Sequence, residues 1–90
     1  MNKREQLIET VPDEEFLFAD GYDDAILGYD SKNLRVIYSV SKCIEILIKE
    51  QGMTEEEAIE YFYFNSEGAY VGEKTPIWCE DGFFFNEEEI

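Results

Sequence analysis

Histidine is absent from this 90-residue sequence, and cysteine occurs only twice. The lack of histidine excludes Ser-His-Asp and Cys-His catalysis in their usual forms. Two cysteines without histidine also cannot supply the four ligands of a structural zinc site. The glycine motifs that cradle phosphates, G-x-x-x-x-G-K-[ST] and G-x-G-x-x-G, are missing as well.

Positive charge is scarce. Seven Lys and Arg stand against 22 Asp and Glu, so the formal net charge is 7 − 22 = −15. Contacts to phosphate require Lys and Arg, so we expect no direct binding to nucleic acid and none to anionic membrane surfaces. The acidic surface then serves either solubility or attraction to a basic partner.

Long apolar runs are missing too. The longest near-apolar stretch, Cys43 to Ile48, is interrupted by Glu45 and is far shorter than the ~20 residues of a membrane-spanning helix. The first residues lead into Leu7-Ile8-Glu9 and not into an apolar segment, so we expect no secretory signal. Both cysteines are therefore expected to be reduced.

What the sequence does contain is enough apolar material for one folded domain over residues 1–90. Hydrophobic residues make up 44% of the chain and aromatic residues 16%, too much for a disordered acidic tail. No linker or repeat divides the chain.

The stretch from Met53 to Trp78 carries the strongest helical signals. Thr54 followed by Glu57 is a capping box, which predicts a helix start. Gly72 is the predicted stop. The residues expected on the buried face recur at helical spacing and are Ala58, Ile59, Phe62, Ala69 and Tyr70. The four aromatic residues 61–64 step about 100° each, so they cannot all face one core.

A second helix is predicted immediately before it, over 40–51, with Ser39 as its cap and Gly52 as its end. Its apolar face comprises Val40, Cys43, Ile44, Leu47 and Ile48. Cys43 is accordingly expected in the core. The two helices should form an αα-hairpin.

Strands are predicted over 25–29 and 34–38, joined by turn residues 30–33 as an antiparallel hairpin. A further strand is predicted over 75–80. The Asp81-Gly82 pair predicts a type I′ turn, with Phe83 to Phe85 pairing back, so that 77–85 forms a second hairpin.

The ends of the chain are less defined. Residues 1–12 fit either a short helix or a flexible arm ended by Pro12, and residues 86–90 form an acidic end. Residues 14–18 fit either a helical turn or an extended segment. The predicted fold class is α+β, a small antiparallel sheet with two consecutive helices packed on one face.

Several stretches resemble a family of small uncharacterised proteins of tailed bacteriophages. They are Y-D-D-A-I-L-G at 22–28, R-V-I-Y at 35–38 and K-C-I-E-I-L at 42–47. The most specific is G-M-T-E-E-E-A-I-E-Y-F-Y-F-N-S-E-G-A-Y-V-G-E-K-T-P-I at 52–77, since similar phage proteins carry G-M-x-x-E-E-A-x-E-Y-F-x-F-N-x-x-G-A-x-V-G-E-x-T-P.

This resemblance covers about residues 20–80, and the aromatic, acidic end from Gly82 onward departs from it. It implies a phage origin and a setting in the cytoplasm of an infected bacterium. It implies no function, because the family is uncharacterised.

Asp20, Asp23, Asp24 and Asp30 are candidates for a divalent cation site at one end of the first hairpin, because oxygen ligands suit Ca²⁺ and Mg²⁺. Their spacing does not match an EF-hand loop, and such residues commonly make turns. We therefore expect no metal and no cofactor. These aspartates, with Phe83, Phe84 and Phe85, remain an alternative partner-binding surface.

The preferred candidate site lies on the helix that begins at Thr54. Glu56, Glu60, Tyr63 and Glu67 fall at i, i+4, i+7 and i+11 and share one face. Solvation explains such a face without any function. The sharper hypothesis is a docking surface for a basic partner, with Tyr63 as an aromatic anchor. Spaced carboxylates can also stand in for the phosphates of a duplex.

Three functions follow from these observations. The first is a non-enzymatic phage protein that binds and inhibits a basic, nucleic-acid-binding host or anti-phage defence protein, as a DNA mimic of the anti-CRISPR or anti-restriction kind. The second is a structural or assembly accessory that acts through homo-oligomer contacts, for which dimerisation through a sheet edge or residues 83–85 is kept open. The third is a carboxylate-dependent metalloenzyme, which we set aside because 22 acidic residues make carboxylate pairs inevitable.

Overall fold

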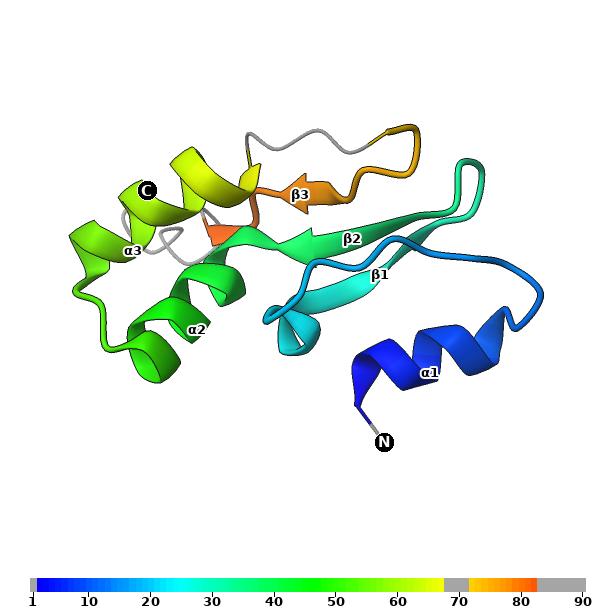
Figure 1. Ribbon diagram of the computed structural model, residues 1–90, viewed down its shortest axis with the longest axis horizontal. Helices are drawn as coiled ribbons and strands as arrows, with labels where there is room; N and C mark the ends of the chain where they lie inside the picture. The colour runs from blue at the N-terminus through cyan, green and yellow to red at the C-terminus, as the bar shows by residue number, and fades with distance from the viewer. Residues whose placement is uncertain (1, 68–71, 83–90) are drawn as a thin grey trace, which may run out of the picture.

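The computed structural model describes residues 2–67 and 72–82. Within these residues it contains three α-helices, three strands and two short helical segments. Their bounds are α1 Lys3–Thr10, η1 Asp23–Ala25, β1 Ile26–Asp30, β2 Arg35–Ser39, α2 Val40–Gln51, α3 Glu55–Tyr61, η2 Phe62–Glu67 and β3 Ile77–Cys79. The segment η1 is a 3₁₀ turn and η2 is π-helical. The α+β class predicted from the sequence is confirmed (Figure 1).

The hairpin of β1 and β2 forms as predicted, with each strand starting one residue later than expected. The strands are antiparallel, with Ile26 opposite Tyr38 and Asp30 opposite Arg35. Asp30 organises the turn, since its carboxylate accepts hydrogen bonds from the backbone N–H of Lys32 and the side-chain amide of Asn33, both at 3.0 Å. This local network makes the turn a property of its own sequence.

The sheet is mixed and not wholly antiparallel, because β3 runs parallel to β2. Ile77 lies opposite Ile37, and Cys79 lies opposite Ser39. The described strands are ordered β1-β2-β3, so β2 is central. Parallel pairing requires a long connection between the two strands, and here α2, α3 and η2 lie within it.

The predicted type I′ turn at Asp81-Gly82 is wrong. That turn needs positive φ at both central residues, and neither is among the positive-φ residues of the described chain. The Asp81 carboxylate is instead bonded to Ser39 and Ser41 at the start of α2. The returning strand of the predicted hairpin, Phe83 to Phe85, lies outside the described residues.

Helices α2 and α3 pair side by side at the end of the sheet where β2 leads into α2 (Figure 1). Ser39 caps α2 by accepting from the N–H of Lys42, and Gly52 ends it in the left-handed conformation at φ 69°. Thr54 and Glu57 form both hydrogen bonds of the predicted capping box at α3. These boundaries were all encoded locally.

The predicted single helix from Thr54 to Gly72 is corrected in two respects. The α-helix ends at Tyr61 and continues as the π-helical η2. Ala58 and Phe62 are fully buried as expected, but Ile59 is 40% exposed, because only a narrow stripe of this short helix contacts the rest of the fold. Ala69 and Tyr70, also predicted to face the core, lie outside the described residues.

The core is centred on an aromatic cluster that joins sheet and helices. The ring of Trp78 stacks on Tyr38, with 5.1 Å between centroids, and meets Tyr22 and Phe62 edge-on at 6.2 and 5.2 Å. The hydroxyl of the fully buried Tyr38 accepts a hydrogen bond from the N–H of Ala19 at 2.7 Å. Phe62 thereby ties the first turn of η2 to β3.

The N-terminal residues form a helix, α1, and not a flexible arm. Asn2 caps it by accepting from the N–H of Glu5, and Leu7 is buried as part of the hydrophobic core. Residues 15–19 follow without regular secondary structure, which settles the alternative left open for 14–18. In Figure 1, α1 lies along β1, well away from α3.

Candidate functional site

The outer surface of α3 and η2 belongs to a stretch of the chain that carries charge of one sign only. Residues 50–73 contain seven Glu and no Lys, Arg or His, a formal charge of 0 − 7 = −7. The two lysines that flank this interval are engaged elsewhere: the Nζ of Lys49 pairs with Glu45, and that of Lys74 donates to the backbone carbonyl of Glu15. The negative charge of this surface is therefore not neutralised by its nearest cations in sequence.

Glu56, Ile59, Glu60, Tyr63 and Phe64 line a shallow groove, called here the α3 groove. The structure thus brings together three of the four residues selected from the sequence, Glu56, Glu60 and Tyr63. The fourth, Glu67, is the last residue of η2, and its side chain lies outside what the structure describes. The docking surface predicted from the sequence did not include Ile59 or Phe64.

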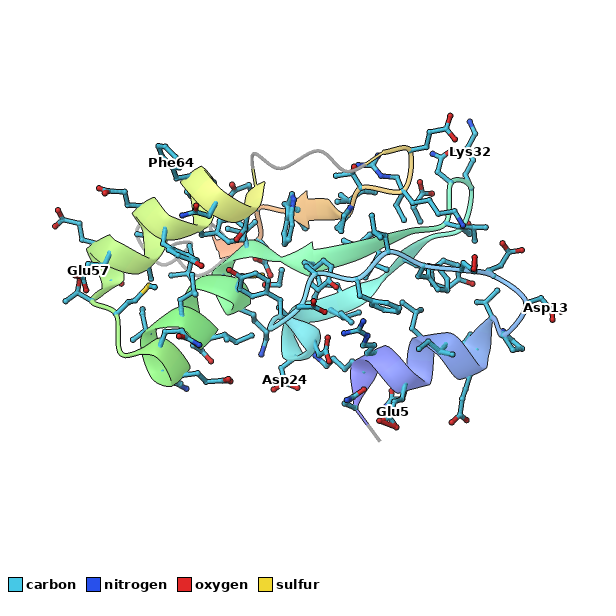
Figure 2. The ribbon with its side chains drawn as sticks, viewed as in Figure 1. Glu5, Asp13, Asp24, Lys32, Glu57 and Phe64 are labelled. Carbon is cyan, nitrogen blue, oxygen red and sulfur yellow. The ribbon has the colours of Figure 1, made fainter. Side chains whose placement is uncertain are left out.

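Phe64 is the most exposed large apolar residue in the described chain, with 83% of its surface open to solvent. Figure 2 shows its side chain projecting from the helix away from the sheet. Ile59 is 40% exposed and Tyr63 39%. Apolar side chains gathered on one exposed strip indicate a binding surface, whereas isolated ones do not.

The exposure of Phe64 follows from the burial of Phe62. Phe62 must point inward to reach Trp78, and Phe64 lies two residues further along the helical turn, on the opposite side. The signal was present in the run of four aromatics at 61–64, which cannot all be buried. Only the packing of Phe62 decides which of them is left outside.

Tyr63 is held in place at the edge of the groove. Its hydroxyl donates to a carboxylate oxygen of Glu80 at 2.5 Å, and its ring meets Phe62 edge-on at 5.2 Å between centroids. Glu80 directly follows β3, so this bond links η2 to the end of the sheet. The contribution of Tyr63 to a partner contact is therefore its ring, because its hydroxyl already has an acceptor.

A second groove lies on the other side of the same helix. Its lining residues are Gln51, Gly52, Met53, Glu57, Glu60, Tyr61, Phe64 and Asn65. Glu60 and Phe64 line both grooves, so they form a ridge between them. An aromatic ring and a carboxylate thus stand together where the two grooves meet.

The structure separates the four aspartates of the alternative partner-binding surface, Asp20, Asp23, Asp24 and Asp30. Arg4 approaches Asp20 at 3.3 Å and Asp23 at 3.6 Å, and the Nζ of Lys3 donates to the carbonyl of Asp24. Asp30 lies at the far end of β1, where its own turn holds it. These four residues do not gather at one place. Within residues 2–67 and 72–82, no group of three metal-ligating side chains occurs.

Two buried ionisable groups, the Cys43 thiol and the Tyr38 hydroxyl, have raised pKa values. Burial, together with the smaller effect of the nearby Asp81 carboxylate, raises the pKa of the Cys43 thiol to about 12. Burial likewise raises the pKa of Tyr38 to about 12, although the hydrogen bond from Ala19 opposes it. Both groups remain protonated at neutral pH, so the thiolate that a nucleophilic cysteine requires does not form at Cys43.

In the described part of the chain, no helix is both long and apolar enough to cross a membrane. No protein-family model, no curated protein and no solved structure matches the chain.

Proposed function

We propose that this chain is a non-enzymatic binding protein whose α3 groove docks on a basic protein surface. The observation that carries the proposal is the combination of an exposed apolar strip, Ile59, Tyr63 and Phe64, with two flanking carboxylates, Glu56 and Glu60. Apolar anchors in a charged setting are typical of protein interfaces, where the anchor supplies affinity and the charges supply orientation and rate.

Solubility alone does not require this arrangement. A solubilising surface needs the carboxylates but gains nothing from an apolar ring that is 83% exposed. Two copies packed groove against groove are also disfavoured, because Glu56 and Glu60 of one copy would face the same charges on the other. Positive charge on the partner compensates the carboxylates, and a partner group that packs on Phe64 removes its ring from water.

The specific form that we favour is a bacteriophage protein acting in the cytoplasm of an infected bacterium. There it would inhibit a nucleic-acid-binding host or anti-phage defence protein, because such proteins present basic surfaces that an acidic protein can occupy in place of phosphates. The phage setting is supported by the resemblance described above. The DNA-mimic form is supported by the run of 24 residues without a cation.

The test is affinity capture from infected-cell lysate with three baits. They are the wild-type chain, the double reversal Glu56→Lys/Glu60→Lys, and the control Glu9→Lys/Asp13→Lys. Both pairs are exposed and change the net charge equally. Glu9 belongs to α1, which lies away from α3 in Figure 1, and Asp13 lies at the opposite end of the molecule from α3 in Figure 2. We expect the wild-type and control baits to retain one basic protein that the α3 reversal loses.

The captured protein is then purified, and its affinity is measured at low and high salt, with and without duplex DNA. We expect the Glu56→Lys/Glu60→Lys variant to bind far more weakly, because like charges opposed across an interface cost several kcal/mol. Competition by DNA would support the mimic. An unchanged affinity, with circular dichroism showing an intact fold, would move the binding face away from α3.

A homo-oligomeric accessory role has one observation in its favour. Strands β1 and β3 are the edges of the described sheet, and Leu27 on β1 is 52% exposed. Light scattering at low and high salt distinguishes the two functions. A dimer that strengthens as salt screens the charge of −15 would support the accessory role.

A further inference from the structure

The chain holds one of its own arginines between an aromatic ring and two carboxylates. The guanidinium of Arg4 lies over Phe18, 4.5 Å from the ring centroid. Its Nη1 is 3.3 Å from Asp20 and 3.6 Å from Asp23. A planar guanidinium suits such a site because it can stack on a ring while its edge donates to carboxylates.

The α3 groove contains the same parts without a cation. Phe64 supplies a ring that is 83% exposed. Glu60 precedes it by four residues and Glu56 by eight, and all three line the groove. No Lys or Arg occurs between Lys49 and Lys74, and both of those side chains are engaged elsewhere.

We infer that the α3 groove recognises an arginine side chain of its partner, with the guanidinium stacked on Phe64 and donating to Glu60, while Glu56, two helical turns before Phe64, adds to the negative charge of the groove. This inference rests on the proposed function and names the chemistry of the contact. It assigns Phe64 the anchoring role that the sequence had suggested for Tyr63, whose hydroxyl is occupied by Glu80.

Arginine is preferred over lysine on physical grounds. The ammonium group of lysine is a compact, strongly hydrated charge, which pairs with carboxylates but stacks poorly. The delocalised guanidinium is more weakly hydrated and can satisfy ring and carboxylate together. Charge attraction alone would treat the two residues nearly alike, so a preference for arginine is diagnostic.

The experiment uses the full chain and two peptides of equal length and charge. One carries arginine spaced by alanine and leucine, and the other carries lysine at the same positions. Affinities are measured by calorimetry for the wild type, Phe64→Ala, Glu60→Gln and the control Leu27→Ala, which removes an exposed apolar side chain on β1. The exposure of Phe64 means that its variant should fold, which circular dichroism checks.

We expect the wild type and Leu27→Ala to bind the arginine peptide about five-fold more tightly than the lysine peptide. Phe64→Ala should bring that ratio close to one. Glu60→Gln should weaken both peptides. Equal affinities for the two peptides in the wild type, a preference that survives Phe64→Ala, or no binding of either peptide would each overturn the inference.

These outcomes are separable from those of the proposed function. If both peptides bind equally and Glu56→Lys/Glu60→Lys abolishes both, docking of basic segments stands and arginine recognition falls. If the captured partner binds that reversal variant as tightly as the wild type, the proposed function falls whatever the peptides do.

Discussion

The carboxylate of Asp81 accepts a hydrogen bond from the hydroxyl of Ser39 at 2.7 Å, joining the residues after β3 to the cap of α2. It also accepts from the hydroxyl and the N–H of Ser41, at 2.9 and 3.3 Å. Burial alone would raise the pKa of Asp81, but the hydrogen bonds from Ser39 and Ser41 outweigh it and lower that pKa. The fold is therefore closed at this point by an ionised carboxylate.

Replacing Asp81 with Asn should lower the free energy of unfolding at pH 7 by about 1 to 2 kcal/mol, because hydrogen bonds to a charged acceptor are lost. The lowered pKa makes this contribution present above the unfolded-state value of about 4, and it is lost as the pH falls through the folded-state value. The difference in free energy of unfolding between the wild type and the variant should shrink below about pH 4. Urea denaturation at several pH values measures it.

Asp13→Asn is the matched control for that experiment. It removes one charge from an exposed aspartate far from α2, so it reports the general effect of reducing a net charge of −15. If Asp81→Asn and Asp13→Asn lower the free energy of unfolding by the same amount at every pH, the role of Asp81 is contradicted.

Truncation of Phe62 should destabilise the protein strongly, whereas truncation of Phe64 should have almost no effect on stability. Phe62 is fully buried against Trp78, so Phe62→Ala should cost about 3 to 5 kcal/mol of stability. Phe64 is 83% exposed, so Phe64→Ala should change stability by no more than about 0.5 kcal/mol. Chemical denaturation of the two variants tests the register of η2. Similar losses in both would place the π-helical segment in a different register.

The two cysteines should differ in reactivity. Cys43 is fully buried and its pKa is raised to about 12 by burial, whereas Cys79 is partly exposed. At pH 8, a thiol reagent should modify one cysteine in the native protein and both in denaturant. The variants Cys43→Ala and Cys79→Ala identify which one reacts. Rapid native modification of the Cys79→Ala variant is the opposing result.

Removing Arg4 should loosen α1 without unfolding the domain. Arg4→Met deletes the contacts with Phe18, Asp20 and Asp23, and we expect a loss of about 1 kcal/mol. Amide hydrogen exchange should rise in α1 and not in α2. Asp20→Asn is the control, since the Asp20 side chain is 93% exposed and its pair with Arg4 is worth little. Unchanged exchange in α1 would show that Arg4 does not anchor it.

Divalent metals should leave the melting temperature nearly unchanged. Asp20 and Asp23 face Arg4, and Asp30 is held by its own turn at the other end of β1. Millimolar Ca²⁺ or Mg²⁺ should therefore act only by screening, and EDTA should have no effect. A rise of several degrees at micromolar metal would reveal a tight site, because a ligand stabilises by RT ln(1 + [L]/Kd).

The sequence by itself determined the features that depend on a few neighbouring residues. Ser39, Gly52 and the Thr54–Glu57 box set the helix boundaries, because each cap bonds backbone groups within its own turn. Asp30 set the turn of the first hairpin in the same way. Periodicity placed Cys43 in the core and put Glu56, Glu60 and Tyr63 on one face.

Tertiary structure decided what depends on partners distant in the chain. Asp81-Gly82 reads locally as a hairpin turn, but Ser39 and Ser41, about 40 residues earlier, compete for the Asp81 carboxylate, and β3 pairs parallel with β2. The four-aromatic run showed that some ring must be exposed. The contact of Phe62 with Trp78 decided that it is Phe64, because a helix that points one side chain into the core turns the residue two positions later outward.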